Sequence, residues 1–327
     1  MKTLFRNVAA IGLLAAVALP VEALASDYPT QPVRIVLPFA AGGSTDIAIR
    51  TFAQHAETYL GQSIAVENRT GGGGGVGVNY GVNVEPDGYT LMGGAIGAHS
   101  ILPAVNRGVG YEPSDYTPIG MFQMNPVVLL VLNESDHQSL DDVIAAIGES
   151  SGSLSHGDLG PGTIHRLTFL LFLESAGLAA DDVIYVPFGG GADSLAALLG
   201  GHVDFHATNL TNAAESLRAG AVRALAVTTP ERVDHFPDIP TFAELGHPDV
   251  DTLAWRGIIG PNDLPSEVVE TWDSVIRAVI DDAEWAATVE ERGDIVFHMG
   301  PDAFAAFIDS EFERYRRLAE ELDFIVE

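Results

Sequence analysis

The residues best placed for chemistry are glycines, gathered in four segments of the chain: 42–43, 71–77, 160–162 and 189–191. Each segment follows a predicted strand and precedes a predicted helix. A helix N-terminus offers unpaired N–H groups and a partial positive charge, and glycine lets another molecule approach the backbone closely. Several such segments that converge would bind an anion without needing a lysine. The glycine pattern therefore predicts an anion-binding cleft.

The longest of these segments also fits a nucleotide pattern, because Gly72, Gly74 and Gly77 match G-x-G-x-x-G after a strand. In dinucleotide-binding folds an acidic residue about 20 positions further on, at the end of the next strand, holds the ribose. Here that strand ends in two glycines and an alanine, 93–95, so the acid is missing. A Walker phosphate loop is also excluded, because Lys2 is the only lysine. A linker is disfavoured because a strand precedes the glycines and a short helix follows them.

Two further patterns bear on catalysis. His202, Asp204 and His206 occupy alternate positions, so a strand would place them on one face, where three such side chains can bind a metal. No HExxH pattern and no cysteine accompanies them, which favours a face without metal. The nucleophile pattern G-x-S-x-G is absent, because Asp46 stands where its last glycine should be. We therefore predict no metal, no cofactor and no catalytic set, and expect that the protein is not an enzyme.

Several charged residues near helix starts are candidates for a role. Arg166 lies in the first turns of the helix after the third glycine segment, where the helix dipole disfavours a cation, so it is either a bidentate clamp for a carboxylate or a solvent-facing residue. His165 beside it is a candidate hydrogen-bond donor with the same alternative. Asp46 is expected to bond N–H groups at the start of its own helix. Arg256 lies elsewhere, with Trp255 after a likely crossing strand, and is expected to stack on that ring.

The composition and the N-terminal residues limit the classes of protein to which the chain can belong. The chain has 327 residues, of which 47% are hydrophobic, enough for one large domain or two of moderate size. Lys2, Arg6, an apolar run over 8–19 and an A-x-A-type site at 23–25 form the pattern of a secretory signal peptide, with cleavage predicted after Ala25. We therefore expect an exported protein. A net charge of −29 argues against nucleic acid and anionic membrane surfaces as partners.

Strands and helices alternate along the chain. Predicted strands cover residues 33–39, 63–68, 89–94, 126–133, 153–159, 182–188, 202–208 and 222–229, and the C-terminal part is mostly helical. Alternation of this kind predicts an α/β fold with a largely parallel sheet. In such sheets the segments that follow the strands lie at their carboxyl ends, where ligands bind, so the glycine segments are expected to meet there.

The order of several motifs resembles a known family. The segments are "VENRTGGGGGVG", "PDGYTL", "GPGTIHRL", "VPFGGGADSLAALLGGHVD" and "WRGIIGP". Together they resemble the solute-binding proteins of tripartite tricarboxylate transporters, also called Bug proteins, from about Tyr28 to the C-terminus. The resemblance implies a type II-like periplasmic binding protein, with two α/β lobes joined by a two-segment hinge and the ligand cleft between them. The first lobe would comprise residues 27–125 and 252–327, and the second 126–251.

The resemblance also implies which residues bind the ligand. In this family one carboxylate is held largely by backbone groups and ordered water at the first-lobe loops, and the second-lobe loops contact the distal part. With His165 and Arg166 added from their positions, the expected ligand-binding set is Phe39, Gly42, Gly43, Ser44, Asp46, Gly73, Gly74, Gly75, Gly160, Gly162, Thr163, His165, Arg166, Phe188, Gly189, Gly190 and Asn209.

One motif departs from the family pattern. The family often has "S-A-G-x-G-T-x-x-H-L" where this chain has "GDLGPGTIHRL". Gly157 and Asp158 replace small residues, and Arg166 stands where the histidine usually is. Asp158 could repel an anionic ligand, while Arg166 could bind an extra carboxylate, which fits either a di- or a tricarboxylate.

The expected function is the periplasmic capture of a small organic di- or tricarboxylate by lobe closure, and its delivery by a monomer to the permease subunits of a membrane transporter. Two alternatives stay open. One is a sensory binding protein that presents its ligand to a membrane receptor kinase. The other is an exported metal-dependent hydrolase that uses the histidine face. The five consecutive glycines are expected to be mobile without ligand and ordered with it.

Overall fold

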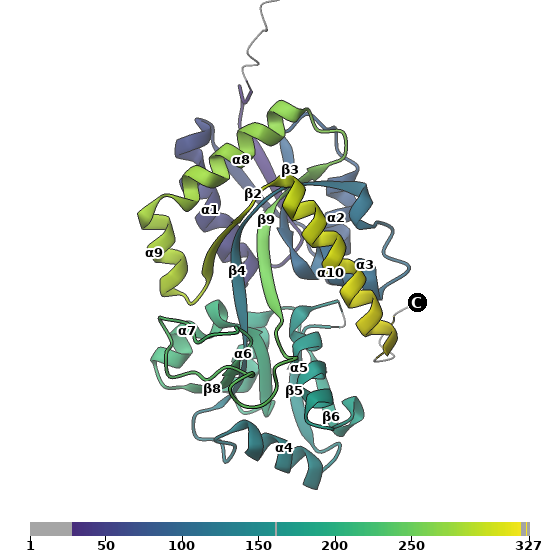
Figure 1. The fold of residues 1–327 in the computed structure, drawn as a ribbon, viewed down its shortest axis with the longest axis vertical. Helices are drawn as coiled ribbons and strands as arrows, with labels where there is room; N and C mark the ends of the chain where they lie inside the picture. Colours follow the sequence, from purple (N-terminus) through teal and green to yellow (C-terminus); the bar gives the residue numbers. More distant parts are fainter. Residues whose placement is uncertain (1–27, 161, 322–324, 326–327) are drawn as a thin grey trace, which may run out of the picture.

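The computed structural model describes residues 28–160, 162–321 and 325, and shows two α/β lobes stacked along the long axis of the molecule (Figure 1). The predicted signal peptide, residues 1–25, lies outside the described residues. Within the described part, none of the helices has the length and apolar character needed to cross a membrane. The α/β class and the two-lobed arrangement predicted from the sequence are confirmed.

The first lobe is built on a sheet with the strand order β2-β1-β3-β9-β4, and β10 pairs with β4. The first three strands are parallel, whereas β9 and β10 are antiparallel to their partners. Its strands are β1 (Val33–Leu37), β2 (Ile64–Asn68), β3 (Thr90–Ala95), β9 (Leu253–Pro261) and β10 (Ile295–Met299), and its helices are α1 (Ser44–Leu60), α2 (Gly75–Val82), α3 (Leu102–Val105), α8 (Ser266–Ile280), α9 (Ala283–Glu291) and α10 (Pro301–Glu321).

The second lobe has a smaller sheet in which β5 pairs in parallel with both β6 and β7, and β4 pairs antiparallel with both β7 and β8. Its helices lie around this sheet in the lower half of Figure 1. Its strands are β5 (Leu154–Asp158), β6 (Val183–Pro187), β7 (Phe205–Asn209) and β8 (Val222–Val227), and its helices are α4 (Leu140–Glu149), α5 (Ile164–Ser175), α6 (Gly191–Leu199) and α7 (Leu210–Arg218).

Strand β4 (Tyr116–Leu132) runs through both lobes beside β9 (Figure 1). Residues up to Pro126 pair with β9 in the first lobe, and residues from Val127 onward pair with β7 and β8 in the second. We expected a strand over 126–133 only, and that start is wrong by ten residues. Pro118 and Gly120 weaken the strand pattern, and the pairing with β9 shifts register there. The sheet is therefore mixed, and the expectation of a largely parallel sheet is also wrong.

The core consists of separate hydrophobic clusters, of which one spans both lobes beside the crossing strands. In the first lobe, Phe52 of α1 and Phe122 of β4 stack with ring centroids 4.3 Å apart. A second cluster joins α10 to α5, because Trp255 packs edge-on against Phe304 and belongs to the same buried group as Phe172. Burial of each such aromatic side chain stabilises the fold by roughly 1.5–3 kcal/mol. The strand ends and helix starts between the lobes are thus held by packed cores on both sides.

Candidate functional site

A cavity of about 460 Å³ lies between the two lobes, where the segments after several strands meet. The first lobe contributes the loops after β1, β2 and β3, and the second lobe contributes the starts of α5 and α6 and the end of β7. Strand β9 closes the hinge side with Ala254 and Arg256. The four glycine segments thus lead to one place, although only three of them supply glycines to the lining, Gly43, Gly71 to Gly74 and Gly189 to Gly191.

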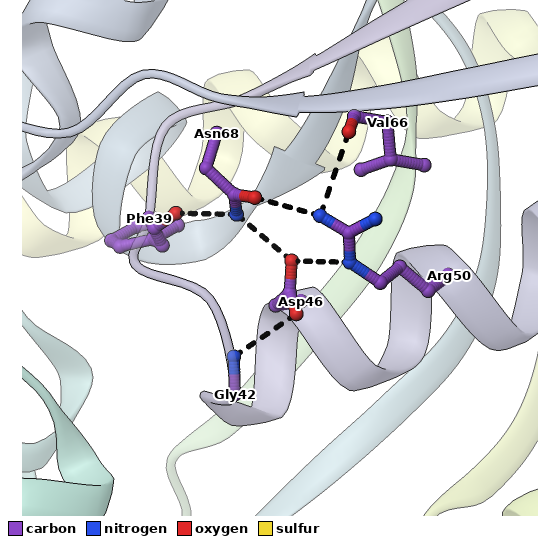
Figure 2. Close-up of polar contacts among 6 residues, drawn as sticks. All are labelled: Phe39, Gly42, Asp46, Arg50, Val66 and Asn68. Carbon is purple, nitrogen blue, oxygen red and sulfur yellow. Dashed lines mark hydrogen bonds and ion pairs between the residues drawn. The ribbon is translucent and has the colours of Figure 1, made fainter.

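The loop between β1 and α1 is shaped by Asp46, as Figure 2 shows. Its carboxylate accepts hydrogen bonds from the backbone of Gly42 at 3.0 Å, from Asn68 at 2.8 Å and from Arg50 at 2.9 Å. Asn68 also donates to the carbonyl of Phe39 at 2.9 Å. Desolvation raises the pKa of Asp46, but these hydrogen bonds together lower it below its ordinary value. Asp46 therefore positions the loop and lies outside the cavity lining.

The glycine run forms a short 3-10 turn and the start of α2. Gly71 to Gly74 all have positive φ, and all four line the cavity. A Cβ on Gly74 would lie 2.8 Å from Cβ of Ala98, and one on Gly77 would lie 2.7 Å from backbone atoms of two neighbouring loops. Glycine is thus required by backbone conformation at the wall of the cavity and by close packing behind it. The expected mobility of the run stays a prediction.

A chain of hydrogen bonds crosses between the lobes at the hinge side of the cavity. Ser44 at the start of α1 donates from Oγ to Oδ1 of Asn209 at 2.9 Å. The same oxygen lies 2.9 Å from Nε2 of His165, and Arg256 donates from Nη2 to Oγ of Ser44 at 3.1 Å. Burial lowers the pKa of His165 to about 4, so the imidazole is neutral at pH 7 and its Nε2–H donates to Asn209.

Arg256 brings a buried positive charge to the cavity. Its side chain donates from Nη1 to the carbonyl of Trp255 at 2.7 Å, and 3% of the residue is exposed. Burial lowers its pKa to about 10, so it stays protonated at neutral pH. Among the described residues no carboxylate lies within 4.0 Å of it. The expected stacking on Trp255 is wrong, because that ring packs against Phe304 while the guanidinium turns to the cavity.

Arg166 and Asp158 neutralise each other outside the cavity lining. The guanidinium makes two parallel contacts with the carboxylate, Nε to Oδ1 at 3.0 Å and Nη2 to Oδ2 at 2.9 Å. It also lies 3.4 Å from the ring centroid of Tyr185. Asp158 ends β5 and Arg166 lies in the first turn of α5, so the intervening loop brings the two together. Each of the two residues thus already has an oppositely charged partner, and the ligand-binding role expected for Arg166 stays a prediction.

The structure divides the residues expected from the sequence into two groups. Those that line the cavity are Phe39, Gly43, Ser44, Gly73, Gly74, Thr163, His165, Phe188, Gly189, Gly190 and Asn209. Those outside the lining are Gly42, Asp46, Gly75, Gly160, Gly162 and Arg166.

Sequence reasoning missed three parts of the lining. One is the segment Ala95 to Gly97, which follows β3 and could have been found by the same strand-end rule as the others. Another is α6 and α7, where Asp193 and Asn212 reach the cavity. The third is Arg256, for which the sequence suggested only stacking on Trp255.

The histidine face does not form in the structure. Strand β7 begins at Phe205, so His202 precedes it and is exposed, and Asp204 accepts hydrogen bonds from the backbone and side chain of Ser155. His206 is buried against Ser194 and the carbonyl of Gly157. In the part of the chain that is described, no three His, Cys, Asp or Glu side chains are grouped to hold a metal ion.

A cleft between two α/β lobes, with helix N-termini of both lobes at its walls, is the architecture of solute-binding proteins, and comparison with known proteins gives the family of this chain. The family model described as the tripartite tricarboxylate transporter family receptor matches residues 48–324, and the chain belongs to this family. Its members are periplasmic solute-binding receptors rather than enzymes.

Individual relatives agree with this assignment. The chain is 29% identical to the protein BugT of Bordetella pertussis over 324 residues, which cover 97% of each chain. MatC from Rhodopseudomonas palustris with bound malate has a TM-score of 0.82 at 28% identity, over 89% of this chain and 99% of that one. A second R. palustris protein, solved with adipate, has a TM-score of 0.86 at 30% identity, over 91% of this chain and 99% of that one.

Proposed function

We propose that this chain captures a small organic di- or tricarboxylate in the periplasm and delivers it to the permease subunits of a tripartite tricarboxylate-type transporter. In this proposal the chain is exported, its signal peptide is cleaved after Ala25, and it acts as a monomer without a cofactor. The carboxylates named for its structural relatives, malate and adipate, support this ligand class.

The observation that carries the proposal is the state of the helix N-termini at the cavity. Helices α1 and α6 begin at its wall, and their N-caps, Gly43 and Gly190, have no side chain to bond the first N–H groups. These groups, with the partial charge of each helix, are left to a ligand. Two such ends from opposite lobes suit an anion that lies between the lobes and contacts both.

The second part of the proposal is lobe closure about β4 and β9. The change of partners between Pro126 and Val127 supports lobe boundaries at 126 and 251, and the bond between Ser44 and Asn209 shows that the two lobes can touch at the hinge side. A ligand that contacts both lobes stabilises the closed state only by binding it more tightly than the open state. The permease would then read the surface of the closed form.

The polar groups of the cavity support binding rather than hydrolysis. Ser44 and His165 both bond to Asn209, so the imidazole is not placed to take the proton of the serine hydroxyl. A sensory role with a receptor kinase would use the same cleft. Neighbouring genes for a small and a large permease subunit would favour transport.

Titration calorimetry of the mature protein tests the proposal. The panel is citrate, tricarballylate, malate, succinate, adipate and an aromatic dicarboxylate at pH 7.5. We expect at least one to bind with one-to-one stoichiometry and a Kd below 1 mM, a threshold of about −4 kcal/mol. If none of these acids binds below 1 mM, the ligand class is wrong.

A further inference from the structure

We propose that Arg256 is the residue that binds one carboxylate of the ligand through its side chain, at the hinge side of the cavity, and so determines which acids are accepted. This inference rests on the proposed function, and it gives the site a fixed positive pole that the glycine loops do not supply. It assigns a ligand-binding role to a residue of β9, which the strand and loop patterns of the sequence did not single out.

The charge of Arg256 has no close counterion among the described residues. Arg256 is 3% exposed as a whole residue, so its charged group has lost most of its water, and such a cation is costly unless an anion lies close to it. The carboxylate that acts on it electrostatically is Asp294, which lies beyond 4.0 Å and whose two oxygens accept from Thr211 and Gln123. Arg256 is therefore a desolvated cation with no contacting anion among the described residues.

The guanidinium of Arg256 also has more hydrogen-bond donors than partners among the described residues. A guanidinium has five N–H donors. Here Nη1 donates to the carbonyl of Trp255, Nη2 donates to Oγ of Ser44, and Nε has no partner among the described atoms. Because Nε is itself buried, the donors left for a ligand in the cavity are the second N–H groups of Nη1 and Nη2. A carboxylate placed there would also reach Ser44, whose hydroxyl can turn from Asn209 toward the ligand.

No other positively charged side chain in the described cavity lining competes with Arg256 for a carboxylate. Arg256 is the one arginine of the described cavity lining. Arg166 lies outside this lining and is paired with Asp158. His165 is neutral at pH 7, since burial lowers its pKa to about 4. Asp193 in the first turn of α6 is the one acidic residue of the described lining, and it is exposed at the rim.

This charge distribution orients the ligand. One carboxylate is attracted to Arg256 on the hinge side, and Asp193 repels a second one from the rim near α6. The second carboxylate is then directed toward the start of α1 and the glycines at 71–74 in the first lobe. The ligand class is accordingly an acid with two separated carboxylates, and a monoacid would leave one of these two poles empty.

The test measures the Kd of the tightest acid of the panel for wild type, Arg256→Gln and a matched control, Arg223→Gln, by calorimetry. Arg223 in β8 is a partly buried arginine that donates to the side-chain oxygen of Asn133. Like Arg256 it has no ion pair within 4.0 Å among the described residues, but it lies outside the cavity lining. Arg256→Gln should raise the Kd roughly 10- to 100-fold, the loss of a hydrogen bond between charged groups. Arg223→Gln should change it less than about 3-fold.

A second measurement follows the side chain itself in case Arg256→Gln fails to fold. Wild type with arginine-selective ¹⁵N labels is titrated with the same acid, and Arg256→Lys, which keeps the buried charge, identifies the Arg256 resonance by its loss. That resonance should shift in step with binding. An unchanged Kd in Arg256→Gln, or an Arg256 resonance that does not move at saturation, would overturn the inference while leaving the proposed function intact. If wild type binds no acid of the panel, the proposed function itself fails.

Discussion

Asp294 is a buried carboxylate between α9 and β10, and its replacement by asparagine should stabilise the protein at neutral pH. Its Oδ1 accepts a hydrogen bond from Thr211 of α7, and its Oδ2 lies 3.2 Å from Nε2 of Gln123. Burial raises the pKa of Asp294 from an ordinary value of 3.8 to about 6, and hydrogen bonds and the charge of Arg256 oppose this only in part. At pH 7 the folded protein therefore holds an ionised carboxylate that is less stable there than in water.

The size and sign of the effect follow from the two pKa values. As pH rises from about 4 to about 6, the unfolded chain releases this proton first, so the folded state loses relative stability. The difference between 3.8 and about 6 corresponds to about 3 kcal/mol, reached in full above the folded pKa. The variant Asp294→Asn has no such proton. Its new amide also finds an acceptor, because Oε1 of Gln123 has no partner among the described atoms and can face it after that amide flips.

Urea unfolding followed by circular dichroism at pH 4, 6 and 7.5 measures this. The free energy of unfolding of Asp294→Asn should exceed that of wild type by up to about 3 kcal/mol at pH 7.5 and by little at pH 4. Taking the difference from wild type removes the effect of every other titrating group. The control is Asp238→Asn, the same change at an exposed position, which should show no such trend. A variant that is less stable than wild type at pH 7.5 would refute the reasoning.

Three further outcomes are expected. Burial lowers the pKa of His99 to about 4, below the ordinary 6.5, so in Asp294→Asn the free energy of unfolding should fall by at least about 2.5 kcal/mol as pH drops from 6.5 to 4. A flat urea profile in that window would contradict this. Gly77→Ala should lower the free energy of unfolding by about 1–3 kcal/mol, because its Cβ would lie 2.7 Å from backbone atoms. The Cβ of Gly72→Ala meets nothing within 4 Å, so this variant should lose only about 1 kcal/mol, for its positive φ. Equal melting temperatures of the two variants would argue against this. Arg166→Gln should lower the free energy of unfolding by roughly 2–3 kcal/mol, since it leaves the buried carboxylate of Asp158 without its counterion. Adding Asp158→Asn should recover most of this loss. If the two substitutions instead had simply additive costs in the double variant, the ion pair would not stabilise the fold.

The part of the site made of backbone could be predicted from the sequence, because its cause is local. A strand followed by glycines and a helix places N–H groups at the end of the sheet whatever the rest of the chain does, and Gly43 and Gly74 do line the cavity. The cavity-facing position of Asn209 was expected from the family resemblance. The bond from its side chain to Ser44 depends on the meeting of two lobes, which no local pattern records.

The charged part of the site could not be predicted in the same way. Whether Arg256 faces the core, the solvent or the cavity depends on the register of β9 against β4, where it stands opposite Gln123. The register shifts at two places, between Pro118 and Gly120 and between Met121 and Gln123. The proline and the glycine there also mask the strand pattern in the sequence. The pairing of Arg166 with Asp158 was missed for the opposite reason. Its partner Asp158 is only eight positions away, and the pairing follows once the loop between β5 and α5 is known to turn back.

The central claim is that a carboxylate ligand lies between the lobes with one end at Arg256. A high-resolution crystal structure of the mature protein with its tightest carboxylate tests this most directly. The account predicts density inside the cavity of about 460 Å³, with one carboxylate within 3.2 Å of the guanidinium of Arg256 and the other among the backbone N–H groups of the first lobe. A ligand bound outside this cavity, or in contact with one lobe only, would contradict it.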